Sequence, residues 1–109
     1  MTNYERHQKM MFDIINNFDF AKVQQTMKFL KWTWWPKGIP TLDDIRFGAR
    51  ERLESVIKNC LLDANPDEEF FVSSGGLKAT AIKDNYGLIT FLQLEFVITS
   101  WELNDPYET

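Results

Sequence analysis

Residues 70–101 read FFVSSGGLKATAIKDNYGLITFLQLEFVITSW, and they contain the only candidate β-sheet in the sequence. This stretch holds three runs rich in β-type residues, separated by two turn signals, SSGG at 73–76 and DNYG at 84–87. Connections this short join neighbouring strands that run in opposite directions. We therefore predict an antiparallel meander with strands over 69–73, 77–83 and 88–101.

The third of these strands shows the clearest alternation. Its alternate residues from Leu88 through Thr90 to Ile98 are nearly all apolar, whereas the intervening set, with Gln93 and Glu95, is mixed. Successive side chains of a strand point to opposite faces of a sheet. We expect the apolar set to face the core and the mixed set to be only partly covered.

The chain before residue 66 is patterned as helices. Apolar residues recur every three or four positions in three segments, which predicts helices from the start of the chain to about 16, over 20–32, and for about 20 residues after a Thr41 cap. A chain of 109 residues is enough for one domain and too short for two. We predict a single α+β domain over 1–109, of order αααβββ, with the helices on one sheet face. Its parts are an N-terminal helix (1–18), a helix pair (19–65), the meander (68–103) and a flexible tail (104–109).

Composition narrows the class of protein. The net charge is −4, which disfavours general nucleic-acid binding, because such proteins use a basic excess to displace counterions from phosphates. A single cysteine fits a reducing compartment. The first ten residues are polar and charged, unlike a signal peptide, and no apolar run approaches the ~20 residues of a membrane helix. We expect a cytoplasmic protein that does not associate with membranes.

Residues suited to catalysis or metal binding are few. The one histidine, His7, falls in the polar opening of the first helix, where a solvated surface residue is expected. Cys60 falls on the apolar stripe of the third helix, which indicates a buried side chain and not an activated thiol. One Cys and one His give no spaced pair of ligands. The sequence predicts a non-enzymatic protein with no catalytic residue, no metal and no cofactor.

Two short segments are candidates for ligand binding. In the SSGG segment, Gly75 and Gly76 permit positive φ, so the segment is either a tight turn or an anion-binding nest beside the Ser74 hydroxyl. Tryptophans stand at 32, 34 and 35, and a helix cannot bury all three on one face, because adjacent positions point about 100° apart. Either they close the edge between helix and sheet, or at least one stacks on a flat ligand or a partner.

Two arginines of the third helix complete the candidate set. Arg46 and Arg50 are one turn apart and share a face. They either bind a phosphate group together or form ion pairs with nearby carboxylates on a solvent-exposed surface. The candidate ligand-binding residues are Trp32, Trp35, Arg46, Arg50, Ser74, Gly75 and Gly76.

These segments together resemble a family of small tailed-phage proteins. KWTW at 31–34 is followed by Pro40 and a Thr-capped helix, then by SSGGLKA at 73–79 and LQLEF at 92–96. In that family a WTW segment precedes a helix, and a TGG-aromatic-x-A strand precedes an L-x-F strand. Here Ser74 stands where Thr is commoner and Leu77 where an aromatic residue is. The resemblance spans roughly residues 20 to 102 and implies phage origin and an accessory role, without assigning a catalytic residue.

The function that these features favour is binding. A stacking Trp, paired arginines and a glycine-rich turn predict a counter-defence protein of the infected host's cytoplasm that sequesters a small nucleotide signal. The alternatives are an inhibitor that binds a host defence protein directly, such as a CRISPR effector, and a module of phage replication. Three strands leave two edges, and an unpaired edge invites another strand. We therefore also expect self-association, as a dimer or larger oligomer, through a sheet edge.

Overall fold

The computed structural model describes residues 2–32 and 38–97. Three helices precede three strands, which confirms the predicted order αααβββ. The elements are α1 (Asn3–Asn17), α2 (Phe20–Phe29), α3 (Leu42–Asp63), β1 (Phe70–Ser74), β2 (Leu77–Lys83) and β3 (Ile89–Phe96).

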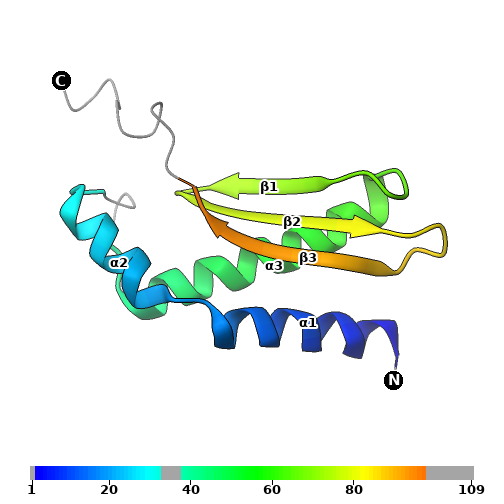
Figure 1. Ribbon diagram of the computed structural model, residues 1–109, viewed down its shortest axis with the longest axis horizontal. Coiled ribbons are helices and arrows are strands. Elements are labelled where there is room, and N and C mark those ends of the chain that lie inside the picture. Colours follow the sequence, from blue (N-terminus) through cyan, green and yellow to red (C-terminus); the bar gives the residue numbers. More distant parts are fainter. Residues whose placement is uncertain (1, 33–37, 98–109) are drawn as a thin grey trace.

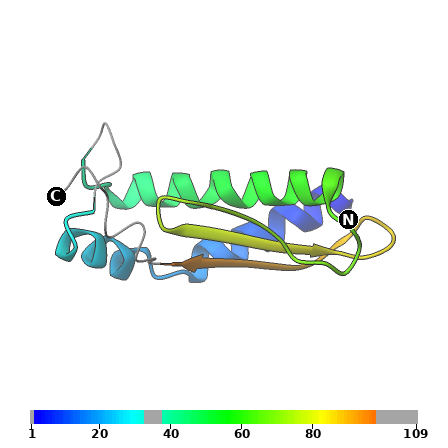
Figure 2. The same ribbon diagram turned by 90° about the horizontal axis from the view of Figure 1, so that it is seen from above.

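The strands form one antiparallel sheet in the order β1-β2-β3 (Figure 1). The long helix α3 lies along one face of the sheet, and α1 runs beside β3 (Figures 1 and 2). The short helix α2 lies near the end of the sheet where β3 finishes (Figures 1 and 2). The predicted packing of helices on one sheet face is therefore confirmed. Within the described part of the chain, no helix has both the length and the apolar character needed to cross a membrane.

Each helix begins at a side chain that caps it. The side chains of Thr2, Asp19 and Thr41 accept hydrogen bonds from the backbone N–H three residues ahead. At α3 the Asp44 carboxylate also accepts from the Thr41 N–H, at 3.1 Å, which completes a capping box. The longest helix therefore has the most firmly defined start.

The end of α2 differs from the prediction, which extended the helix to Trp32. Lys31 adopts a left-handed conformation (φ +55°), and its N–H donates to the Lys28 carbonyl. The Trp32 N–H donates back to the Met27 carbonyl at 2.8 Å. These two bonds form a Schellman motif, which satisfies the last carbonyls of the helix and turns the chain out of it. Trp32 is therefore outside the helix and directed towards the sheet.

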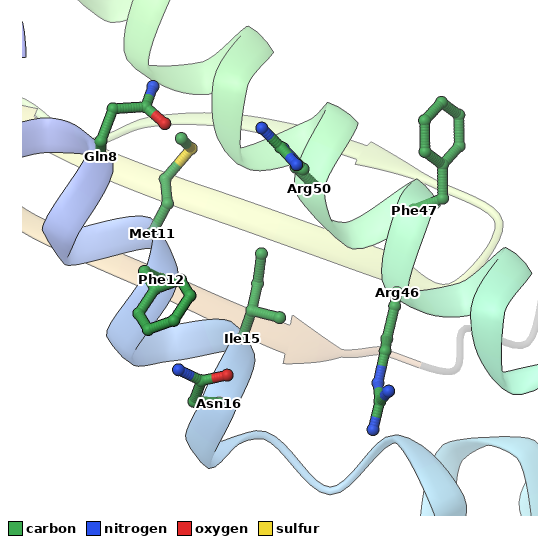
Figure 3. Close-up of a pocket in the computed structure, with 8 residues that line it drawn as sticks. All are labelled: Gln8, Met11, Phe12, Ile15, Asn16, Arg46, Phe47 and Arg50. Atoms are coloured by element: carbon green, nitrogen blue, oxygen red, sulfur yellow. The ribbon is translucent and has the colours of Figure 1, made fainter.

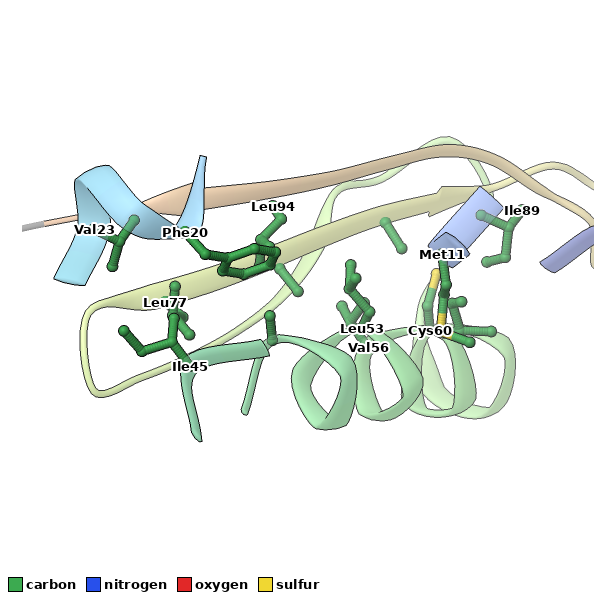
Figure 4. Close-up of a cluster of buried hydrophobic side chains, with 14 of the residues drawn as sticks. Met11, Phe20, Val23, Ile45, Leu53, Val56, Cys60, Leu77, Ile89 and Leu94 are labelled. Atoms are coloured by element: carbon green, nitrogen blue, oxygen red, sulfur yellow. The ribbon is translucent and has the colours of Figure 1, made fainter. Parts of the chain in front are cut away.

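The core lies between α3 and the inner face of the sheet (Figure 4). Cys60 is buried on α3 as predicted, and this burial raises the pKa of its thiol. On β2 the side chains of Leu77, Ala79 and Ala81 are fully buried beneath the helix. The buried stripe of α3 that meets them comprises Ile45, Ala49, Leu53, Val56, Ile57 and Cys60.

The start of β3 corrects the predicted alternation. Ile89 is fully buried and Thr90 is exposed, the reverse of what the sequence pattern indicated. Lys83 pairs with Ile89 while Ile82 pairs with Phe91, so Thr90 is an extra residue in a β-bulge. A bulge shifts the alternation by one and exchanges the two faces. Beyond the bulge the prediction is confirmed as far as Phe96, because Leu92, Leu94 and Phe96 pack on the core side. The rest of the predicted strand, from 98 to 101, and the predicted tail over 104–109 lie outside the described residues.

Candidate functional site

The SSGG segment is a two-residue hairpin turn between β1 and β2. Ser74 pairs with Leu77, and the two loop residues, Gly75 and Gly76, have φ of +60° and +86°. Positive φ at both central positions is the requirement of a type I′ turn, which only glycine and a few polar residues meet easily. The twist of the hairpin thus explains why two glycines stand here.

Trp32 lies directly against this turn. Its ring centroid is 5.7 Å from that of Phe96, and both rings contact Gly76. A Cβ atom added at Gly76 would be 2.8 Å from Phe96 Cε2 and 3.0 Å from Trp32 Cη2. The Gly76 carbonyl accepts a hydrogen bond from the Val97 N–H at 2.7 Å. The space above Gly76 is therefore already filled by aromatic rings, and the turn forms a packing joint between the end of α2 and the sheet.

Arg52 is the arginine that reaches this joint, and sequence reasoning missed it. Its Nε donates to the Ser74 carbonyl at 2.8 Å, and its Nη1 donates to the Gly48 carbonyl at 2.7 Å. The guanidinium is partly buried, and this desolvation lowers the pKa of Arg52. It fixes the turn to α3. No local pattern distinguishes Arg52 from Arg46 and Arg50, so the sequence carries no signal for this contact.

Arg46 and Arg50 lie on a different flank of α3, the one that faces α1 (Figure 3). Arg50 Nε donates to Glu54 at 3.0 Å, and the Arg46 guanidinium carbon is 5.8 Å from the centre of the Phe20 ring. In Figure 3 Arg50 and Ile15 point into the space between the helices. This hollow of about 340 Å³ is lined by Gln8, Met11, Phe12, Ile15, Asn16, Arg46, Phe47 and Arg50.

A second hollow of about 560 Å³ continues the first along the same two helices. Gln8 and Met11 line both, so we treat them together as the α1–α3 groove. The second hollow is lined by Asn3, Tyr4, His7, Gln8, Met11, Glu54, Ile57, Lys58, Leu61 and Gly87.

His7 forms part of this groove and corrects the expectation of a solvated surface residue. Its side chain is only 7% exposed, and its Nε2 accepts a hydrogen bond from the Ile89 N–H at 3.4 Å. Burial, and secondarily the charge of Arg6, lowers its pKa. The histidine thus ties α1 to the start of β3, next to the bulge. Its spacing of four from Met11 was the signal that it belongs to the buried stripe of α1.

The buried His7 predicts a loss of stability in mild acid. Only the neutral imidazole can accept the hydrogen bond of the Ile89 N–H at Nε2. The pKa of His7 is lower in the folded chain than its ordinary value of 6.5. Neutral His7 therefore contributes stability above about pH 6.5, and this contribution is lost as the pH falls below that value towards the lowered pKa. We expect the free energy of unfolding, measured by urea titration, to fall over this window more steeply for the wild type than for His7→Gln. Parallel pH profiles would contradict the assignment.

The predicted ligand-binding residues therefore fall in two places. Trp32, Ser74, Gly75 and Gly76 meet at the packing joint, whereas the two arginines lie in the α1–α3 groove. Trp35 lies outside the described residues. Over residues 2–32 and 38–97, no cluster of three or more His, Cys, Asp or Glu side chains could hold a metal ion. Comparisons with protein-family models, curated proteins and solved structures return no match.

Proposed function

We propose that this protein binds a small anionic ligand of the nucleotide class in the α1–α3 groove and performs no catalysis. The resemblance to small tailed-phage proteins implies an accessory role, and we propose that this role is counter-defence through sequestration of such a ligand. The observation that carries the proposal is the pair Arg46 and Arg50 at the rim of an apolar hollow.

Charge supports an anionic ligand. The residues that line the groove include three cations, Arg46, Arg50 and Lys58, and one anion, Glu54. The whole chain carries −4, so the groove is locally opposite in sign to the protein. Arginine donates two parallel hydrogen bonds to phosphate oxygens, which favours phosphate over a spherical anion.

The walls of the groove support a flat apolar group beside that charge. Phe12 on α1 lines the smaller hollow and is 65% exposed, so an aromatic face is available for stacking. The side-chain amides of Gln8 and Asn16 offer donors and acceptors to the edge of a base. A volume of about 340 Å³ lies within the range of small-molecule sites, about 300–1,000 Å³.

Isothermal titration calorimetry against linear, cyclic and ADP-ribose-type nucleotides tests this function. We expect at least one to bind, and the variant Arg46→Gln/Arg50→Gln to weaken binding at least about tenfold, because charge-assisted hydrogen bonds contribute about 1.5–3 kcal/mol each. A matched control is Lys22→Gln/Lys28→Gln, which removes the same charge from exposed positions of α2. A panel that gives no binding, or binding that both variants reduce equally, would contradict the proposal.

A second candidate function is direct binding of a host protein. Tyr4, Phe12 and Phe47 are large aromatic residues exposed along the groove, and aromatic and Arg side chains are enriched where proteins bind one another. Affinity capture from host lysate distinguishes the two functions. A stoichiometric protein that the Arg46→Gln/Arg50→Gln variant no longer retains favours this second function, whereas a co-purifying nucleotide favours the first.

A further inference from the structure

The two edges of the sheet are unequal. At β3, α1 runs alongside, and His7 accepts the hydrogen bond of the Ile89 N–H. Beyond β1 no helix or strand of the described chain lies in the plane of the sheet (Figure 1). The β1 residues 70–74 read FFVSS, without the proline or charged residue that commonly protects an edge.

The phase of the hydrogen bonds shows which groups of β1 face outward. The Val97 N–H donates to the Gly76 carbonyl, and in an antiparallel ladder bonded pairs alternate with non-bonded ones. Along β2, therefore, Lys78 and Thr80 bond to β3, and the residues between them bond to β1. The residues of β1 opposite Lys78 and Thr80 are Ser73 and Phe71. Their N–H and C=O groups point to the open edge.

We propose that β1 pairs with β1 of a second copy of this chain, antiparallel about a two-fold axis at Val72. In that register Phe71 of each copy lies opposite Ser73 of the other, and each opposing pair exchanges two N–H···O=C bonds. The two strands present the same outward groups, as a two-fold interface requires. The result is a continuous six-stranded sheet. This inference is independent of the nucleotide proposal.

Charge complementarity identifies a second copy as the partner. Acidic residues, ending in the exposed Glu69, precede β1, and Lys78 lies on the outer face beside the end of β1, with its Nζ 4.7 Å from the Phe71 ring centre. Antiparallel pairing places the start of one β1 near the end of the other. Glu69 of each copy then approaches Lys78 of its partner. The Phe71 side chain, 57% exposed, becomes covered in the same step.

A proline at Ser73 tests this interface. Proline lacks an N–H and is tolerated in a strand where that N–H faces away from the sheet. Ser73→Pro should leave the β1–β2 ladder intact and raise the dimer dissociation constant at least about tenfold, because two symmetric hydrogen bonds are lost. Ser73→Ala retains the N–H and is the matched control. The measurement is sedimentation velocity over a series of protein concentrations, with circular dichroism to verify folding.

A charge exchange tests the register independently of any backbone change. Glu69→Lys and Lys78→Glu should each weaken the dimer, and the double variant should restore it. A wild type that stays monomeric at millimolar concentration would overturn the proposal. So would an oligomer that neither Ser73→Pro nor the single charge variants weaken. If Ser73→Pro fails to fold, the charge exchange alone decides, since restoration supports the proposed register and its absence contradicts it.

Discussion

Gly76→Ala is expected to lower the free energy of unfolding by about 2–5 kcal/mol. Two costs add at this position. The backbone has φ +86°, where any residue with a Cβ is strained by about 1–2 kcal/mol. The new methyl would also lie 2.8 Å from Phe96 Cε2 and 3.0 Å from Trp32, which forces rings to shift in a packed site at about 1–3 kcal/mol.

Gly87→Ala is the matched control for this prediction. Its φ is +74°, close to that of Gly76, but a Cβ there meets nothing within 4 Å. The control thus carries the backbone cost alone, and urea denaturation of both variants isolates the packing cost. Equal losses of stability in the two variants would show that Trp32 and Phe96 do not close over the turn.

Leu53→Ala is expected to destabilise the protein by about 3 kcal/mol. Leu53 is fully buried at the centre of the α3 stripe, against the inner face of the sheet. Truncating a buried leucine removes its transfer free energy and leaves a cavity, with measured costs of about 2–5 kcal/mol in comparable sites. Urea denaturation at one protein concentration gives the value.

Leu62→Ala serves as the control on the same helix. Leu62 is 69% exposed, so the same change of side chain should alter the free energy of unfolding by no more than about 0.5 kcal/mol. The difference between the two variants measures the burial of the Leu53 face alone. Comparable losses at both positions would contradict the packing of α3 on the sheet through that face.

The fold could be predicted largely because each element carries a local signal. The two glycines of the hairpin, the Thr41 cap and the apolar spacing of α3 act through neighbouring residues, and the structure agrees with each. The errors arise where distant parts of the chain meet. The bulge at Thr90 lies between β2 and β3, and no local pattern encodes it. The spacing of His7 from Met11 indicates the buried face of α1, but not the contact of His7 with Ile89, 82 positions away.

The candidate site illustrates the same limit. The sequence singled out Trp32, the glycine turn and two arginines, but it could not show which arginine meets the turn. Arg52 does so because its position on α3 faces the end of β1, whereas Arg46 and Arg50 face α1. A motif that looked like one binding site is thus divided between a packing joint and a groove.

Trp32 packs over Gly76, so the glycine turn is a packing joint. Proton NMR measures this packing through the contact between the Trp32 indole and the Gly76 α-protons. We expect a strong nuclear Overhauser effect between them and an upfield ring-current shift of one Gly76 α-proton, because Trp32 ring carbons lie 3.0–3.1 Å from where a Cβ would stand. Unshifted Gly76 protons without an Overhauser effect to Trp32 would contradict the joint and leave the turn open to a ligand.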